Sequence, residues 1–269
     1  MHRAAIGIFD SGIGGLTVAA EIVRRLPTED IIYLGDTARL PYGTKSAETV
    51  IRYADRAVDL LLRYPVKMVV IACNTASAYA LESLREGSEL PILGVIAPGA
   101  RAAVAATTTG RIGIAGTEAT VRSQAYQKAI TALRPDAELT TRAWPLLVPL
   151  AEEGWVDHPV ARLTLRTYLE PMVAAGVDTL VLGCTHYPVF KRVIEDLLAT
   201  ELGGYPLALV DSAEAVTTEL DALLTERELH APTREGRRSF FCTDAAERFG
   251  RVGATFFPED VAPVFPVDI

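Results

Sequence analysis

Short runs of apolar residues that end abruptly in polar residues recur along the chain, and segments with helical spacing follow them. In the clearest case, residues 68–72 are apolar or small and lead directly into Cys73, Asn74 and Thr75. A short apolar run with these boundaries indicates a buried strand of a parallel sheet, followed by a helix. We therefore expect the cysteine to be the last strand residue, with Asn74 or Thr75 as the N-cap of the helix.

The same alternation of strand and helix patterns continues through most of the chain. It predicts a strand at 6–9, a strand and loop over 30–46, a helix over 46–63 capped by Ser46, a short strand before a Pro-Gly turn at 98–99, a helix over 158–175, and a strand and capped helix between 206 and 229. Two short strands are expected near the C-terminus. Alternating elements of this kind are typical of an α/β fold with mainly parallel sheets.

One stretch of this pattern occurs twice. Residues 177–187, VDTLVLGCTHY, correspond to 66–76, VKMVVIACNTA, so that Cys184 takes the place of Cys73. The segment at 112–117 likewise repeats the first strand and the turn after it. Both repeats lie roughly 110 residues after their first copies, which indicates an internal duplication.

The duplication sets the expected domain organisation. We expect two similar α/β domains related by a pseudo-twofold axis, with the best cleft between them. The first should comprise residues 1–97 together with 208–269, a tail that has no counterpart in the repeat and is expected to pack back on that domain. The second should comprise residues 98–207.

Composition and charge narrow the class of protein. The chain has 269 residues, a formal net charge of −8 and a pI near 5.1, which argue against nucleic acid or an anionic membrane as the main partner. Its apolar runs are short, so we expect neither a signal peptide nor a membrane-spanning segment. Three cysteines in a chain of this length do not make a disulfide framework, and we expect reduced thiols in the cytoplasm.

The two repeated cysteines are the first candidates for chemistry. Each is expected to end a strand, at the edge of the sheet where α/β proteins bind their ligands. A helix N-terminus at Cys73 should lower the pKa of its thiol below the ordinary value and favour a thiolate. Cys242 follows two phenylalanines with no helix signal close behind, and we interpret it as structural.

Two equivalent thiols across one cleft fit few reactions. A hydrolase needs one nucleophile, and a dithiol redox pair usually has its cysteines close in sequence. Cys73, Cys184 and His186 are capable of binding zinc with Cys242 or Asp10, but no CxxC or HxxxH spacing supports a metal site. A pyridoxal enzyme needs a suitably placed lysine, which the pattern does not offer. Inversion of a stereocentre does need two groups, because one thiolate removes a proton while the opposite thiol supplies one to the other face.

Polar neighbours extend this candidate site. Asp10 and Ser11 follow the first strand in a glycine-rich turn that matches neither P-loop nor GxGxxG spacing. Asp10 is expected beside Cys73, and His186 lies two residues after Cys184. Each can hold or pass a proton for its cysteine.

Two loops that hold the same place in the two halves add further candidates. Tyr42 and Gly43 follow a proline, and Gly43 permits an unusual backbone that can expose an amide to a cleft. In the second half, Glu152 and Glu153 follow Pro149 in the same way. A pair of glutamates before a glycine is normally a solvated turn, and only the repeat suggests a role in the site.

Five motifs in this chain resemble, in sequence order, those of the glutamate racemases, a family of cofactor-independent amino-acid racemases: DSGIGGLTV, LPYGTKS, ACNTASA, the Glu of PLAEEG and LGCTHYP. The resemblance implies two α/β domains with the substrate between them, no cofactor or metal, and interconversion of L- and D-glutamate. It also implies a homodimer in a bacterial cytoplasm, where D-glutamate serves peptidoglycan synthesis and thereby cell-wall biogenesis and cell shape. An aspartate racemase or related two-cysteine racemase, and a non-catalytic protein that binds acidic amino acids, remain the alternatives.

The resemblance also assigns roles to residues. Cys73 resembles the acid/base thiol that serves D-glutamate, and Cys184 resembles the one that serves L-glutamate. Asp10 resembles the helper of the first thiol, and His186 with Glu152 resembles the helpers of the second. The residues that resemble substrate binders are Asp10, Ser11, Tyr42, Gly43, Asn74, Thr75, Thr117, Thr185 and His186.

Overall fold

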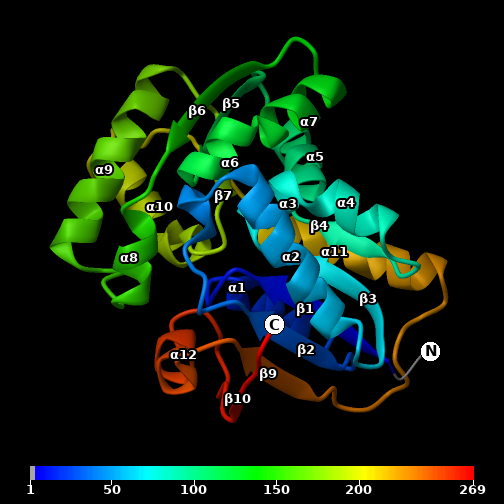
Figure 1. The fold of residues 1–269 in the computed structure, drawn as a ribbon. Coiled ribbons are helices and arrows are strands. Elements are labelled where there is room, and N and C mark those ends of the chain that lie inside the picture. Colours follow the sequence, from blue (N-terminus) through cyan, green and yellow to red (C-terminus); the bar gives the residue numbers. More distant parts are fainter. Residues whose placement is uncertain (1–3) are drawn as a thin grey trace.

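The computed structural model describes residues 4–269, so the first three residues of the expected first domain lie outside the described part. The chain forms two parallel sheets that carry helices on their faces (Figure 1). The larger sheet has the strand order β10-β9-β2-β1-β3-β4, and the smaller one has the order β6-β5-β7-β8. The α/β fold class predicted from the sequence is therefore confirmed.

The strands of the larger sheet are β1 (Ala5–Asp10), β2 (Ile31–Gly35), β3 (Val66–Ile71), β4 (Ile92–Gly94), β9 (Arg238–Cys242) and β10 (Val264–Pro266). Those of the smaller sheet are β5 (Arg111–Gly116), β6 (Glu138–Ala143), β7 (Thr179–Gly183) and β8 (Ala208–Asp211). The α-helices are α1 (Leu16–Arg25), α2 (Ala47–Leu61), α3 (Asn74–Tyr79), α4 (Leu81–Glu86), α5 (Ile96–Ala106), α6 (Glu118–Ser123), α7 (Ala125–Leu133), α8 (Leu147–Glu152), α9 (Pro159–Ala174), α10 (Lys191–Thr200), α11 (Ser212–Glu226) and α12 (Ala246–Gly253). Short 3₁₀ helices lie at η1 (Tyr42–Thr44) and η2 (Tyr187–Phe190).

The two sheets repeat one topology. The order β2-β1-β3-β4 in the larger sheet matches β6-β5-β7-β8 in the smaller one, so that β1 corresponds to β5 and β3 to β7. All strand pairs are parallel, and each carboxyl end therefore meets its neighbours at one edge of its sheet. The duplication inferred from the two cysteine motifs is thus present in the order of the strands.

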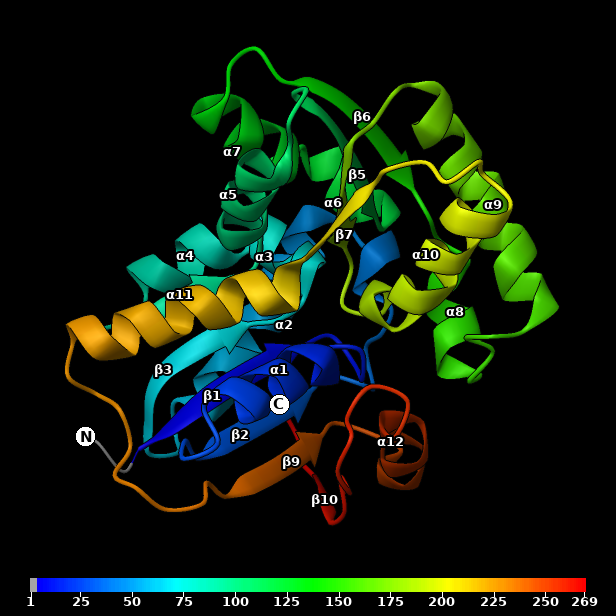
Figure 2. The same cartoon turned by 180° about the vertical axis from the view of Figure 1, so that it is seen from behind.

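Both faces of each sheet are covered. Alternate residues of β1 and β3 face α2 on one side and α1 on the other, which leaves both strands buried along their whole length. In the smaller sheet, α5 and α7 cover one face while α9 and α10 cover the other (Figures 1 and 2). The nearly continuous apolar runs in the sequence reflect this burial on two faces.

Two expected boundaries differ from the structure. Pro98 and Gly99 form no turn but lie in the first turn of α5, where a proline is tolerated because its missing N–H has no helical acceptor. β8 pairs with β7, so residues 208–211 extend the smaller sheet instead of the larger one and move the expected boundary past Asp211. β8 is the counterpart of β4, and it completes the second copy of the repeat.

The C-terminal tail beyond β8 lies against the larger sheet. α11 packs against α1, and a link then leads to β9, which pairs with β2, while β10 pairs with β9. The sequence predicted that the tail packs back on the first domain and that it forms two short strands, but it did not predict α12 between these strands (Figure 1). Within residues 4–269, the helices are all too short or too polar to cross a membrane.

Candidate active site

A cavity of about 380 Å³ is lined by loops from both sheets, at the carboxyl ends of β1, β3, β5 and β7. Its walls include these sequence-predicted site residues: Ser11, Tyr42, Gly43, Cys73, Asn74, Thr75, Thr117, Glu152, Cys184, Thr185 and His186. Asp10 is the exception, because it is fully buried behind the wall. The structure therefore brings the predicted residues together, although they come from segments far apart in the sequence.

Cys73 lies two residues beyond the end of β3 and is itself the N-cap of α3, which corrects the expectation that Asn74 or Thr75 would cap the helix. Its Sγ accepts a hydrogen bond from the amide of Ala76 at 3.4 Å and contacts the hydroxyl of Ser11 at 3.3 Å. The thiol can take the capping position because a sulfur lone pair replaces the usual side-chain oxygen.

The pKa of Cys73 also differs from the expectation. Burial, together with the charge of Asp10, raises the pKa of this thiol to about 12. The contacts from Ser11 and Ala76 act in the opposite direction but are outweighed. The helix N-terminus predicted to activate Cys73 belongs to a helix of only six residues, and desolvation decides the outcome. Cys73 is therefore a protonated thiol at neutral pH.

Asp10 ends β1 and connects the two halves of the site. Its Oδ2 accepts from the amide of Gly12 at 2.9 Å, and its Oδ1 is 3.5 Å from the hydroxyl of Thr185. Burial raises the pKa of Asp10, although the nearby His186 and these hydrogen bonds oppose the rise. Asp10 is thus a buried carboxyl group whose charge acts on Cys73 and which interacts with the loop that carries Cys184.

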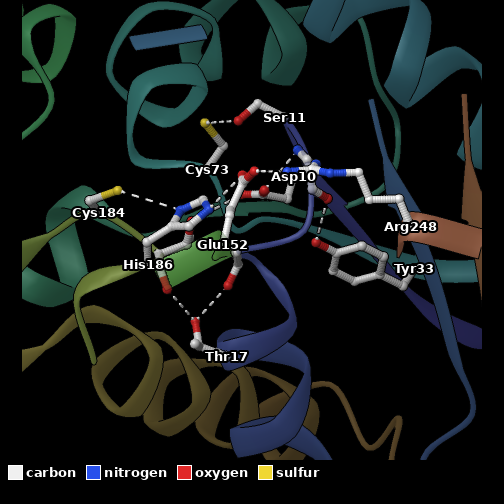
Figure 3. A network of polar contacts seen from close by, with 12 residues as sticks. Asp10, Ser11, Thr17, Tyr33, Cys73, Glu152, Cys184, His186 and Arg248 are labelled. Carbon is white, nitrogen blue, oxygen red and sulfur yellow. Dashed lines mark hydrogen bonds and ion pairs between the residues drawn. The ribbon is translucent and has the colours of Figure 1, made fainter. Parts of the chain in front are cut away.

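On the other side, four side chains form a chain of polar contacts that leads away from Cys184 (Figure 3). The Sγ of Cys184 is 3.8 Å from Nδ1 of His186. Nε2 of His186 is 3.2 Å from Oε1 of Glu152, and Nη2 of Arg248 donates to Oε2 of the same carboxylate at 2.9 Å. Both carboxylate oxygens are therefore engaged by nitrogen atoms.

The charges along this chain follow from its contacts. Burial acts to lower the pKa of His186, but the contacts with Cys184 and Glu152 outweigh it and raise the pKa to about 10. For Glu152, burial acts to raise the pKa, yet hydrogen bonds from His186 and Arg248 keep the pKa below its usual value. At neutral pH the chain therefore holds an imidazolium between Cys184 and an ionised Glu152.

Hydrogen-bond donors in the remaining wall are available for a polar ligand. Asn74 uses its Oδ1 to accept from the hydroxyl of Tyr126 at 2.7 Å, and its buried Nδ2 has no partner among the described residues. The hydroxyls of Thr75 and Thr117 lie 3.0 Å apart, so they join one wall of the cavity to the other. By contrast, Tyr42 donates its hydroxyl to Asp36, away from any ligand.

Sequence reasoning missed two polar residues that hold the site together. Thr17 in α1 donates its hydroxyl to the backbone carbonyl of Thr185 at 2.9 Å, which joins the first half to the Cys184 loop. Thr17 lies inside the motif DSGIGGLTV, which was a signal for it. Arg248 lies in the unrepeated tail, and no motif or period marks it.

A cavity lined by a thiol from each half, with a proton-holding group near each thiol, suits proton transfer on two faces of a small molecule. The part of the chain that the structure describes contains no group of three or more His, Cys, Asp or Glu residues arranged to hold a metal ion. Cys242, predicted to be structural, is buried in β9.

A family model, curated sequences and solved structures were each compared with this chain, and all three comparisons find racemases. Residues 6–220 match the family Asp/Glu/Hydantoin racemase. A glutamate racemase of Geobacter metallireducens is 53% identical over 270 residues, covering 100% of this chain and 98% of that protein. Among solved structures, glutamate racemase RacE1 of Bacillus anthracis has a TM-score of 0.94 at 36% identity and covers 100% of this chain and 99% of its own. A glutamate racemase of Francisella tularensis in complex with D-glutamate has a TM-score of 0.91 at 34% identity, with 100% and 98% coverage.

Proposed function

The chain belongs to the Asp/Glu/Hydantoin racemase family, and we propose that it is the isomerase that interconverts L-glutamate and D-glutamate. The observation that carries this proposal is the pair Cys73 and Cys184, which come from the two copies of the repeat and line one cavity. Similarity to glutamate racemases along almost the whole chain favours glutamate over aspartate. A protein that only binds an acidic amino acid has no use for two thiols in equivalent positions.

In the direction from L- to D-glutamate, Cys184 is the base. Its thiolate takes the α-proton, so the Cα–H bond breaks and an S–H bond forms on Cys184. The imidazolium of His186, whose Nδ1 is 3.8 Å from this sulfur, stabilises the thiolate before the transfer. Cys73 gives its own proton to the opposite face of the carbanion and becomes a thiolate. The raised pKa of Cys73 suits this role.

The reverse reaction exchanges the two roles. Cys73 removes the proton from D-glutamate, and Cys184 supplies the proton to the other face. The hydroxyl of Ser11 and the amide of Ala76 contact the sulfur of Cys73 and stabilise it as a thiolate. Between turnovers, exchange with solvent through the cavity returns each thiol to its starting protonation state, and we assign His186, beside Cys184, and Asp10, whose charge acts on Cys73, the role of aiding that return.

The α-proton of an amino acid is much less acidic than a thiol, so the substrate must be held by groups that stabilise the developing negative charge. We assign this role to the side chains of Asn74, Thr75 and Thr185, which are residues of the cavity wall; the buried Nδ2 of Asn74 has no partner among the described residues. Ser11, Tyr42, Gly43 and Thr117 complete the walls around the substrate. A cavity of about 380 Å³ has room for glutamate.

Isotope exchange in heavy water, together with replacement of each thiol, tests the mechanism. D-glutamate formed from L-glutamate should carry deuterium from the first turnover, while unreacted L-glutamate stays mostly protiated, because one sulfur takes the substrate's proton and the other sulfur, which has exchanged with solvent, supplies the product's. Cys73→Ser and Cys184→Ser should each lower the rate in both directions by about 10²-fold or more. Near wild-type racemisation by either variant, or a product that keeps its original proton, would show that one base does both jobs.

The reaction as proposed uses no cofactor or metal. Turnover should therefore survive exhaustive chelation, and the purified protein should lack the absorbance of pyridoxal phosphate. Loss of turnover in chelator that zinc restores would instead identify a metal enzyme. Comparing turnover on enantiopure glutamate and aspartate tests the substrate, and a preference for aspartate would overturn that part of the proposal.

We place this activity in the bacterial cytoplasm, where its D-glutamate enters peptidoglycan and so supports the cell wall and cell shape. Depletion of the protein should then stop growth unless D-glutamate is supplied.

We also propose a homodimer, supported by four large apolar side chains exposed around α8 and α9: Leu146, Trp155, Val160 and Leu163. Sedimentation of the purified chain as a monomer at micromolar concentration would contradict the dimer.

A further inference from the structure

Arg248 reaches the site from α12, a helix in the tail that has no counterpart in the repeat. We propose that Arg248 is a positioning residue for the Cys184 half of the site, acting on His186 through Glu152. This inference rests on the proposed racemase function and adds a residue to it. Within the described part of the chain, the polar contacts of Cys73 come instead from Ser11 and from the start of α3.

The need for a positioning group follows from where Glu152 lies. It is the last residue of α8, where the free carbonyl groups of a helix end disfavour a negative charge. A glutamate side chain also has several rotatable bonds, and one hydrogen bond from His186 leaves its second oxygen free to turn toward solvent. Arg248 engages that second oxygen at 2.9 Å and so keeps the first oxygen directed at His186.

The tail also contacts His186 directly. The ring of Phe256, which follows α12, meets the imidazole edge to face with 5.2 Å between ring centres. Glu152 is mostly buried, whereas Arg248 is 38% exposed, so the arginine closes the contact chain at its solvent end. Together, Phe256 and the Arg248–Glu152 pair restrict the imidazole to the orientation that meets Cys184.

Among the described residues, the titratable groups that face His186 are Glu152 from α8, Asp10 from β1 and Cys184 from its own loop. Loss of Arg248 has two opposed effects on the imidazolium. Removing a cation favours it, but releasing the carboxylate removes its direct partner at 3.2 Å. Since the interaction of charges falls with distance, the direct contact outweighs the effect of the more distant arginine. The net result of the loss is a less favoured imidazolium and a His186 ring that is no longer held toward Cys184.

A double-mutant cycle with Glu152→Gln tests the proposal. Arg248→Ala should lower kcat about tenfold and change KM little, because the substrate is still bound while proton transfer is impaired. In the Glu152→Gln background, Arg248→Ala should cost almost nothing further, since the arginine acts through the carboxylate. Equal losses in both backgrounds would show that Arg248 acts by another route and would overturn the proposal.

Control variants separate positioning from general charge and from folding. Arg251 lies on the same helix, is exposed and has no ion-pair partner among residues 4–269, so Arg251→Ala removes the same charge without touching Glu152. It should retain wild-type kcat. Arg248→Lys keeps a cation with a single donor and should recover part of the lost rate. No recovery with lysine, or an equal loss in Arg251→Ala, would contradict the positioning role.

Alkylation of the two thiols gives a second readout that does not depend on turnover. The rate of modification of Cys184 by iodoacetamide, followed by peptide mass spectrometry, should fall severalfold in Arg248→Ala, while that of Cys73 in the same sample stays unchanged. Equal changes at both cysteines would indicate a disturbed fold and count against the proposal.

Because L- and D-glutamate are enantiomers and equally stable, kcat/KM for racemisation must fall by the same factor in both directions. Failure of the wild-type protein to racemise glutamate would instead reject the proposed function.

Discussion

At the scale of single residues, the two thiols occupy equivalent positions but different environments. Cys73 is held protonated by burial and by the charge of Asp10. Cys184 has an imidazolium beside it, since His186 has a pKa of about 10. The two sulfurs therefore come from the two copies of the repeat, while the residues beside them differ between the halves. The raised pKa of Cys73 suits the thiol that supplies a proton when L-glutamate is the substrate.

This difference predicts the effect of removing the Asp10 charge. Asp10 raises the pKa of Cys73, so Asp10→Asn should lower that pKa and increase the thiolate fraction at pH 8. Alkylation of Cys73 by iodoacetamide should become about threefold faster or more, while racemisation becomes slower because the proton-holding group is gone. Ser11→Ala should slow the alkylation instead, since the Ser11 hydroxyl stabilises the thiolate. The same sign in both variants would contradict this account.

At the scale of elements, the sequence predicted most strands and the longer helices because their apolar periods are strong. The ends were harder to predict. α8 contains Pro149, and a proline in a sequence segment argues against a helix. Here the proline lies in the first turn of the helix, where it is tolerated. α12 contains Gly250, which costs about 1 kcal/mol relative to alanine in a helix, and it forms because Phe249 and Val252 are buried against the larger sheet. Such tertiary packing is not visible in local sequence.

The site shows the same limit. The repeat located both cysteines and the turn at Asp10, because strand ends can be inferred from apolar runs. It did not reveal the raised pKa of Cys73, which depends on burial and on a charge from another strand. Nor did it reveal Arg248, which reaches Glu152 across almost a hundred residues of sequence. A pKa shift or a contact that depends on segments far apart in the sequence can be identified only once the fold is known.

The turn between β1 and α1 makes a sharp prediction at this scale. A methyl group on Gly14 would overlap the imidazole of His186 and the hydroxyl of Thr185, whereas one on Gly12 would meet only Leu40 at 3.4 Å. Gly14→Ala should therefore displace His186 and reduce kcat/KM about 10²-fold. Its cost in stability should stay within about 1–3 kcal/mol. Gly12→Ala should lose much less activity, and equal losses in both variants would show that turn flexibility matters instead of the contact.

At the scale of the whole molecule, the smaller sheet leads back to the larger one through α11 and the link that follows it. α11 begins directly after β8 and packs against both α1 and α5. The tail then adds β9 and β10 to the larger sheet and brings α12 toward the cavity, where Arg248 meets Glu152. The unrepeated tail therefore belongs to the larger sheet, yet its helix α12 reaches the Cys184 side of the cavity (Figure 2).

A buried ion pair holds the link between α11 and β9, residues 227–237, in place. It lies at the end of β3 that is remote from the cavity. Lys67, in β3, and Glu29 have fully buried side chains, and Nζ of Lys67 donates to the carboxylate. The same Nζ donates to the carbonyl of Leu229 at 2.6 Å, and Glu29 accepts from the amide of Ala231 at 2.8 Å. Both partners of the ion pair thus also hold the backbone of the link.

Breaking this pair should destabilise the whole protein without impairing the chemistry. Lys67→Ala leaves the Glu29 carboxylate buried without its cation, which should cost about 3–5 kcal/mol in the free energy of unfolding. The double variant Lys67→Met with Glu29→Gln removes both charges and keeps most of the volume, so it should cost considerably less. Arg24→Ala, which breaks an exposed pair with Glu21, should cost less than about 1 kcal/mol and serves as the control. Urea denaturation measures each value, and kcat of the folded variants should remain near wild type because Lys67 lies at the end of β3 remote from Cys73. A loss for Lys67→Ala no larger than that for Arg24→Ala would show that the link is held by its other contacts.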